Sequence, residues 1–425
     1  MHIDTEQFRR DGYLIIREAV PPEHLGNLRI SSELMVDEMK RLSRRARQPE
    51  DPFGGSWYAQ PQPRVEVERV VTEETANLVD FYLGESVLGV SQLLLGGPEV
   101  AISSAQISCS GLIDYGFTAW HRDASAATQA PTTGMQADLM DNSWGYVQWN
   151  IALYDDDVFW FLPGSHRAPT TEQQRQELLM DGFSEIIGGI PIDLRAGDGV
   201  VYLNLGMHGG RYYSSKMRRT IHLGFRAFGV DVFPGSFHYH WDRGLGFTRH
   251  LSEQARKFYT RSAELYTEER DLVEFTLRAV AKGNEVEFSK RLAELHPGEQ
   301  HRMVAVVLLY RIATMITLIH SPENAMMTVE ERKKMVGESP PSEFSENLAG
   351  RFTTAESAAL GRRFAELARR LAADARQVEQ HYTEVYEDLN PGEINPPDFE
   401  SRPLRCFHSE MPVGFGVDEF VASWQ

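Results

Sequence analysis

The chain has 425 residues, of which 42% are hydrophobic and 24% are charged, proportions typical of soluble globular proteins. Its formal net charge of −18 argues against nucleic acid and anionic membrane surfaces as partners, because both repel an acidic body. Two cysteines are too few for a disulfide framework and suit a reducing cytoplasm. The N-terminus has no basic region followed by an apolar core, so we expect no signal peptide.

The first hundred residues are predicted to alternate between helices and short strands. Residues 5–17 indicate a short helix that leads into a strand at 13–16, and Pro21 and Pro22 begin a longer helix with one apolar face. A further helix is expected around 85–95. The alternating segment 100–108 then predicts a strand that carries Ser104 and Gln106.

His121 and Asp123 follow, two residues apart, and side chains at this spacing share one face of a strand. A single short segment can therefore offer both to one metal ion. With His208 from a later strand they supply the two imidazoles and one carboxylate of a facial site, which binds iron(II) and leaves positions open.

The segment 145–153 alternates between apolar and polar residues. Val147 and Trp149 belong to a face that packs, while Gln148 and Asn150 belong to a face that lines a pocket or meets water. The run Asp155–Asp157 lacks the ligand spacing of a calcium loop, so it predicts a solvated turn.

Two more strands are predicted at 200–207 and 219–228. In the second, Arg219, Ile221, Leu223 and Phe225 share one side, and Arg218, Thr220 and His222 share the other. If the apolar side faces the interior of a barrel of such strands, Arg219 points inward and Arg218 outward.

Helical patterns replace strand patterns after about residue 250. The apolar run 303–319 has Arg311 at its middle and is better explained as a buried helix than as a membrane span. Thr353 and Glu356 form a capping box, and proline-rich residues 389–405 indicate an extended tail. No catalytic constellation occurs here. We therefore expect a domain at 1–250 and a structural or oligomeric helical region at 251–425, which could cover the site or form a homodimer interface.

Four separated motifs together resemble one known family. They are Phe-Arg-Arg-Asp-Gly-Tyr-Leu-Ile-Ile at 8–16, His-Arg-Asp at 121–123, Phe-Leu-Pro-Gly-Ser-His-Arg at 161–167, and His208 followed after eleven residues by Arg219. In these motifs the chain resembles the phytanoyl-CoA dioxygenase family of iron(II)- and 2-oxoglutarate-dependent oxygenases. The resemblance covers residues 1 to about 230.

The resemblance implies an α+β protein built on a double-stranded β-helix (jelly-roll) core with flanking helices. His121, Asp123 and His208 would bind iron(II), and Arg219 would hold the distal carboxylate of 2-oxoglutarate. Oxygen would then oxidise a C–H bond of a small molecule, with release of succinate and carbon dioxide. The carboxylate ligand favours hydroxylation over halogenation, while desaturation, ring closure and epoxidation stay open. A tailoring step in secondary metabolite biosynthesis is a further expectation.

Other residues of these motifs are weaker candidates. Gln106 and Ser104 could touch 2-oxoglutarate, and four residues could meet substrate, each with an equally plain structural explanation: Arg122, Trp160, His166 and Tyr212. Two other functions also fit the three ligands. One is a zinc-dependent hydrolase or lyase with an open fourth position, and the other is a non-catalytic jelly-roll binding protein.

Overall fold

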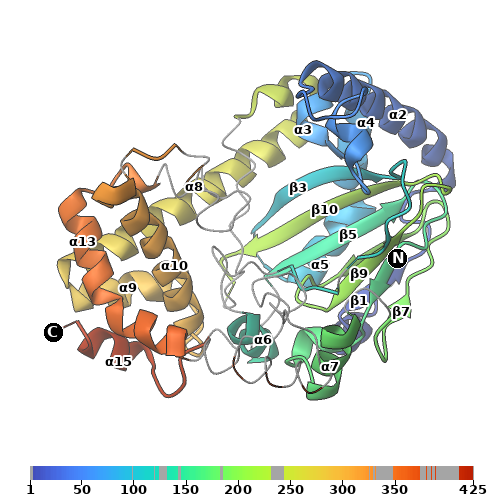
Figure 1. Ribbon diagram of the computed structural model, residues 1–425. Coiled ribbons are helices and arrows are strands. Elements are labelled where there is room, and N and C mark those ends of the chain that lie inside the picture. The colour runs from blue at the N-terminus through green and yellow to red at the C-terminus, as the bar shows by residue number, and fades with distance from the viewer. Residues whose placement is uncertain are drawn as a thin grey trace. The chain divides into compact units, whose positions relative to one another are not determined.

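The computed structural model describes residues 3–97, 99–118, 120–123, 132–141, 145–181, 185–230, 244–324, 326–328, 331, 348–373, 380, 384, 388 and 411–424 (Figure 1). It divides into two compact units. Unit 1 contains Met1–Arg122, Tyr146–Phe228 and Gly244–Ser262, and unit 2 contains Asp123–Gly145, Gly229–Arg243 and Ala263–Gln425. The domain boundary expected at residue 250 stays a prediction. The tail predicted at 389–405 lies outside the described residues.

The helices of unit 1 lie mostly before its sheets in the chain. They are α1 (Thr5–Asp11), α2 (Pro22–Arg45), η1 (Ser56–Ala59), α3 (Val67–Val70), α4 (Ala76–Tyr82), the π-helix η2 (Glu85–Gly89), α5 (Val90–Leu95), η3 (Ser165–Arg167), α7 (Glu172–Asp181) and η5 (Gly246–His250). Gly12 ends α1 at φ 83°, and its amide donates to the Phe8 carbonyl, which turns the chain directly into the first strand.

Two antiparallel sheets form the centre of unit 1. The six-stranded sheet has the order β1 (Tyr13–Ile16), β8 (Gly199–Tyr202), β5 (Tyr146–Ala152), β10 (Arg219–Phe228), β3 (Glu99–Cys109) and β2 (Arg64–Glu66). The four-stranded sheet has the order β4 (Gly116–Phe117), β9 (His208–Tyr212), β6 (Phe159–Phe161) and β7 (Ile190–Pro191). Antiparallel sheets combined with many helices confirm the α+β class.

The two faces of the six-stranded sheet contact different elements. Trp149 lies on the face covered by α5, where its indole nitrogen donates to Ser91 Oγ at 2.9 Å. The opposite face contributes Tyr202 and Val200 to a cluster with Phe159 and Phe161 of the other sheet. Because side chains alternate along a strand, Gln148 and Asn150 belong to this second, inner face.

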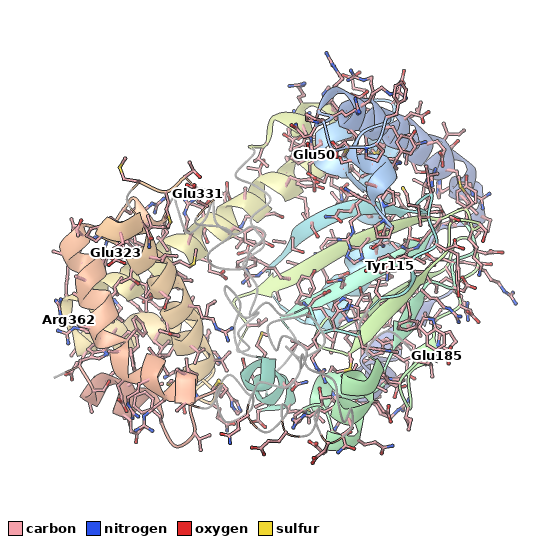
Figure 2. The ribbon with its side chains drawn as sticks, in the orientation of Figure 1. Glu50, Tyr115, Glu185, Glu323, Glu331 and Arg362 are labelled. Atoms are coloured by element: carbon pink, nitrogen blue, oxygen red, sulfur yellow. The ribbon has the colours of Figure 1, made fainter. Side chains whose placement is uncertain are left out.

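Unit 2 is helical in its described residues. Its helices are α6 (Thr132–Asp141), the C-terminal part of α8 (Glu253–Lys282), α9 (Glu285–Leu295), α10 (Met303–His320), η6 (Pro322–Asn324), α13 (Thr354–Arg363) and α15 (Val417–Ala422). The capping box of Thr353 and Glu356 is confirmed, with both of its hydrogen bonds formed. The packed side chains include Phe288, Phe364, Phe420 and Trp424, while charged side chains such as Glu323 and Arg362 face solvent (Figure 2).

Two helical segments of the described chain are long and apolar enough to cross a membrane when judged by length and composition alone. They are Ala76–Leu95 and Met303–His320, and 61% of the second is buried within the fold. A buried core helix passes the same test of length and composition. The sequence predicts such a helix for 303–319, because Arg311 at its middle would be costly inside a membrane.

Candidate metal centre

A backbone ladder brings the two imidazoles of the centre together. Gly116 and Phe117 pair with Tyr212 and Arg211 at the far end of β9. The chain then runs antiparallel to β9 until His121 lies opposite His208. These two residues exchange both backbone hydrogen bonds, each at 2.9 Å, and their ring centroids are 4.4 Å apart.

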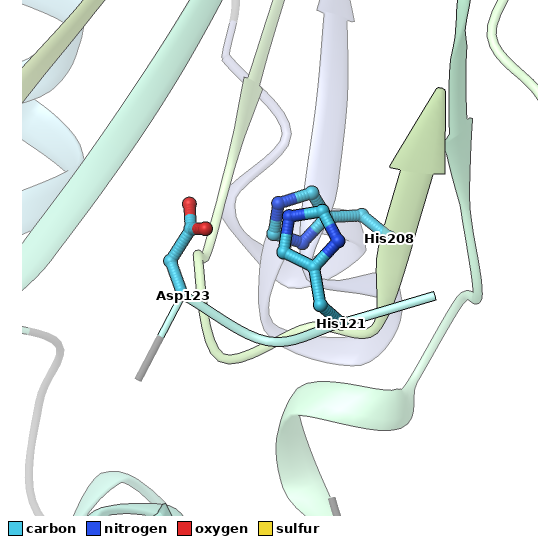
Figure 3. Close-up of side chains that lie close together, drawn as sticks. All are labelled: His121, Asp123 and His208. Atoms are coloured by element: carbon cyan, nitrogen blue, oxygen red, sulfur yellow. The ribbon is translucent and has the colours of Figure 1, made fainter. Parts of the chain in front are cut away.

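Asp123 completes a group of three side chains that could hold a metal ion (Figure 3). One ligand atom from each of His121, Asp123 and His208 lies within 4.8 Å of the other two. Asp123 is only two residues from His121, so its position is set by the local course of the chain. His208 is buried, whereas the other two are partly exposed, and two imidazoles with one carboxylate are a donor set that suits iron(II).

A backbone carbonyl fixes the tautomer of His208. Its Nδ1 lies 2.9 Å from the Gly206 carbonyl oxygen, which can only accept a hydrogen bond, so Nδ1 carries the proton. Nε2 is therefore left with its lone pair for a metal. Ligand histidines in metalloproteins are commonly oriented by a second hydrogen bond of this kind.

Polar side chains continue from the centre across the inner face of the six-stranded sheet. Gln148 Nε2 donates to Tyr202 Oη at 2.8 Å and lies 3.3 Å from His222 Nε2. His222 Nδ1 lies 2.8 Å from Asn150 Oδ1, so this ring is read as neutral with its proton on Nδ1. The Tyr202 ring is 5.4 Å from the His208 ring, which connects this row to the metal ligands.

Arg219 lies on the other face of the sheet. Its Nε is 2.8 Å from Glu33 Oε1 on α2, its Nη2 is 3.0 Å from Glu33 Oε2, and its Nη1 donates to the Arg218 carbonyl at 2.7 Å. The apolar side of 219–228 is buried, but against helices and not inside the barrel: Phe225 packs against Phe258 of α8. The condition under which Arg219 was expected to point inward is therefore not met. The role expected for Arg219 stays untested, and its guanidinium already has a carboxylate.

Arg218 lies on the inner face, together with Thr220 and His222. Its Nε donates to Asp156 Oδ2 at 2.8 Å, and its Cζ lies 5.5 Å from the centre of the Tyr212 ring. The side chain is only 6% exposed, yet its Nη1 has no hydrogen-bond partner. A buried guanidinium N–H without an acceptor is costly, and it marks a place where a ligand oxygen would be favourable.

Asp156 corrects the prediction for the acidic run. Instead of forming a solvated turn, its carboxylate is buried and accepts from Arg218, from the Thr220 hydroxyl and from the Val158 amide at 2.9 Å. Burial alone would raise the pKa of Asp156, but the Arg218 charge and these hydrogen bonds outweigh it and lower the pKa. Asp155 and Asp157 have separate partners, the Ala196 amide and Lys216.

The two weaker co-substrate candidates lie on β3 beside the inner row. Gln106 is directly opposite His222 in the ladder, and Ser104 is opposite Gly224. Both are partly exposed, and Gln106 Oε1 is buried without a hydrogen-bond partner. Their roles stay predictions, and their placement on the inner face is compatible with contact to a ligand.

The four substrate candidates are distributed between structure and site. Arg122 is buried and donates to the carbonyls of Ser165 and Leu205, and Trp160 packs edge-on against Phe117 at 5.5 Å. His166 is 1% exposed, and its Nε2 donates to the Arg9 carbonyl at 3.1 Å. These three therefore have structural contacts that account for them. Tyr212 differs, because it lies against Arg218 on the inner side of β9.

Sequence reasoning missed the roles of Arg218, Asp156, Tyr202 and His222. One signal was present, because the alternation of β5 and β10 had already placed Gln148 and Asn150 on a polar face and Arg218, Thr220 and His222 on another. Recognising that these two polar sets form one face requires the strand register, in which His222 lies opposite Asn150. That pairing joins residues 72 positions apart, and no local pattern shows it.

Comparison with known proteins found no matching family model and no matching curated protein. Solved structures similar to the chain include AviO1 from Streptomyces viridochromogenes Tue57, which is 19% identical over 54% of this chain and 98% of that one, with a TM-score of 0.38. SnoN, a non-heme alpha ketoglutarate dependent epimerase from nogalamycin biosynthesis, is 18% identical over 52% and 80%, with a TM-score of 0.37. HygX from Streptomyces hygroscopicus, crystallised with nickel and 2-oxoglutarate, is 16% identical over 54% and 89%, with a TM-score of 0.36.

The second of these proteins is described as alpha ketoglutarate dependent, and the third was crystallised with nickel and 2-oxoglutarate. Identities and TM-scores this low do not carry a function from those proteins to this chain.

Proposed function

We propose that the chain is a non-haem iron(II)- and 2-oxoglutarate-dependent oxygenase that oxidises a C–H bond of a small molecule. The observation that supports this proposal most directly is the group of His121, Asp123 and His208, whose ligand atoms lie within 4.8 Å of one another. When bound, iron(II) and the 2-oxo acid would activate dioxygen, with decarboxylation of the acid to succinate and oxidation of the substrate.

The strand order is compatible with a double-stranded β-helix. From β3 onward the chain crosses between the sheets after every strand except β6, with β3, β5, β8 and β10 in one sheet and β4, β6, β7 and β9 in the other. The metal ligands would then lie at the start of β9 and just beyond β4, and the polar row of Gln148, Tyr202 and His222 would line the barrel beside them.

The inner side of β9 connects the metal ligands to Arg218 through Tyr212. His208, Gly210 and Tyr212 share one face of this strand, so Gly210 lies about 6.7 Å from His208 along it. A Cβ on Gly210 would come within 2.7 Å of Tyr212 Oη, so the Tyr212 phenol lies directly over Gly210. Arg218 lies against the same phenol, which supports it as the residue that would hold the distal carboxylate of a 2-oxo acid.

Arg218 thus replaces Arg219 as the proposed partner of the distal carboxylate. Its unpartnered Nη1 supports this assignment, and Tyr212 adds a phenol beside it. Burial raises the pKa of Tyr212, so this phenol keeps its proton and can donate at neutral pH. A zinc hydrolase has no need of such a carboxylate site, which is why the oxygenase is preferred over that alternative.

The test is an anaerobic titration of iron(II) and 2-oxoglutarate into metal-free protein, followed by visible absorption. We expect a weak charge-transfer band that needs both additions and is absent in His208→Ala. Iron bound without any band would contradict the proposal, and activity restored to chelated protein by zinc alone would favour a hydrolase or lyase. Absence of metal binding by calorimetry would instead support a non-catalytic binding protein.

A further inference from the structure

The buried ion pair between Arg218 and Asp156 has a consequence for the acid that the site accepts. A guanidinium binds a ligand carboxylate most strongly when no neighbouring carboxylate already neutralises its positive charge. Here Asp156 already accepts from Nε, and both side chains are nearly buried, at 6% and 4% exposure. The pair is formally neutral before any ligand arrives.

Asp156 also fixes the direction of the guanidinium. Its Oδ2 accepts from Arg218 Nε and from the Thr220 hydroxyl, its Oδ1 accepts from the Val158 amide, and its backbone exchanges two hydrogen bonds of 2.9 Å with Leu194. The carboxylate is therefore fully used and cannot turn away. With the Nε edge held in this way, Nη1 is left without a partner in the buried cluster.

A second carboxylate at Nη1 would give this cluster a net negative charge. Arg64 is the other cation that acts on Tyr212, but it is exposed and screened by solvent. Cys109 lies nearby as a neutral thiol, because burial raises its pKa to about 11. Repulsion from Asp156 would thus offset much of the binding free energy that a charged distal group gains from Arg218. A 2-oxo acid with a neutral distal acceptor would keep its hydrogen bond to Arg218 without this repulsion.

We propose that Asp156 is a positioning residue that aims Arg218 at the distal group of the 2-oxo acid and, by neutralising it, lets the site accept 2-oxo acids with an uncharged distal acceptor. This inference rests on the proposed function. It predicts a co-substrate site with weak selection for a dicarboxylate over a monocarboxylate of the same length.

The experiment compares 2-oxoglutarate with its C5 monomethyl ester as ligands of the iron(II)-loaded protein without oxygen, using the charge-transfer band to measure each dissociation constant. In the wild-type protein we expect the two constants to agree within about tenfold, because a charged acceptor gains little here over a neutral one. A preference for the dicarboxylate of more than about a hundredfold would overturn the inference.

Asp156→Asn isolates the charge, since any steric effect of the ester methyl group is the same in both proteins. We expect the ratio of the two constants to shift at least about threefold toward 2-oxoglutarate in this variant, because any loss of positioning weakens both ligands alike. Asp157→Asn is the matched control, because it removes the same charge from a side chain that is 45% exposed and should leave the ratio unchanged. An unchanged ratio, or one shifted toward the ester, in a folded Asp156→Asn protein would count against the inference.

The two proposals fail in different ways. If iron binds but neither acid produces a band, the oxygenase function is lost and this inference with it. If both acids produce the band but the dicarboxylate is strongly preferred, only the role of Asp156 is overturned. Should Asp156→Asn fail to fold, the wild-type ratio of the two constants decides alone.

Discussion

Replacing Arg218 and Arg219 separately should affect ligand affinity very differently. In Arg218→Ala the 2-oxo acid loses one or two charge-assisted hydrogen bonds, worth about 2–4 kcal/mol in total, so its affinity should fall by roughly 30- to 1,000-fold. In Arg219→Ala the affinity should change by less than about threefold, because this side chain contacts Glu33 on the helix-facing side.

Stability should separate the two variants as well. Arg218→Ala leaves the Asp156 carboxylate buried at 4% exposure without its cation, which should lower the free energy of unfolding by about 3–5 kcal/mol. Arg219→Ala leaves Glu33, which is 37% exposed and can be hydrated, so we expect a loss of about 1–2 kcal/mol.

The assays are urea denaturation for stability and the anaerobic charge-transfer band for ligand affinity. Arg218→Met combined with Asp156→Leu separates the two effects, since it removes both charges and should recover stability without recovering ligand affinity. The reasoning from strand register is refuted if Arg219→Ala abolishes binding of the 2-oxo acid while Arg218→Ala preserves it.

Three further outcomes are expected from single residues. His166 is buried, which lowers its pKa from 6.5 to about 4, so the unfolded chain binds more protons than the folded chain between these pH values. The free energy of unfolding should therefore rise by up to about 3 kcal/mol from pH 4 to pH 6.5. Urea titrations of His166→Gln should lack this slope. Asp138→Ala should lower the free energy of unfolding by about 2–4 kcal/mol, because Asp138 and His296 form a pair 3.0 Å apart at 0% exposure. Asp141→Ala is the control: it breaks the more exposed pair with His301 and should cost less than about 1 kcal/mol. Gly210→Val should weaken binding of the 2-oxo acid at least about tenfold and leave iron(II) binding by calorimetry unchanged, since its side chain would displace the Tyr212 phenol that lies over Gly210 beside Arg218.

The sequence was sufficient for the elements and for the ligand group, because both depend on local patterns. The strand at 13–16, the helix that begins at Pro22 and the capping box at Thr353 follow from alternation, proline at a helix start and side-chain capping, and each is confirmed. His121 and Asp123 could be found because their spacing places both on one face of a short segment and the other motifs strengthen that weak signal; their ligand atoms do lie close to that of His208.

The sequence was insufficient wherever the answer depended on which face of a sheet is inside. In β10 the apolar face packs against helices and the polar face lines the interior, which is the reverse of the usual expectation for a sheet with one solvated side. The burial of Asp156 was missed for a similar reason. A run of three acids indicates a solvated turn, and the buried cation that pairs with Asp156 lies 62 positions later in the chain.

The paired backbone bonds between His121 and His208 also bear on which metal the protein acquires. The two imidazoles are set side by side by the backbone ladder, so little ordering of the backbone remains when an ion arrives. For nitrogen and oxygen donors the intrinsic affinity of divalent ions places copper, nickel and zinc above iron(II). The protein would then depend on the metal supply of its cell for correct loading, and protein purified from iron-poor cultures is expected to carry a tighter-binding ion that only chelation removes.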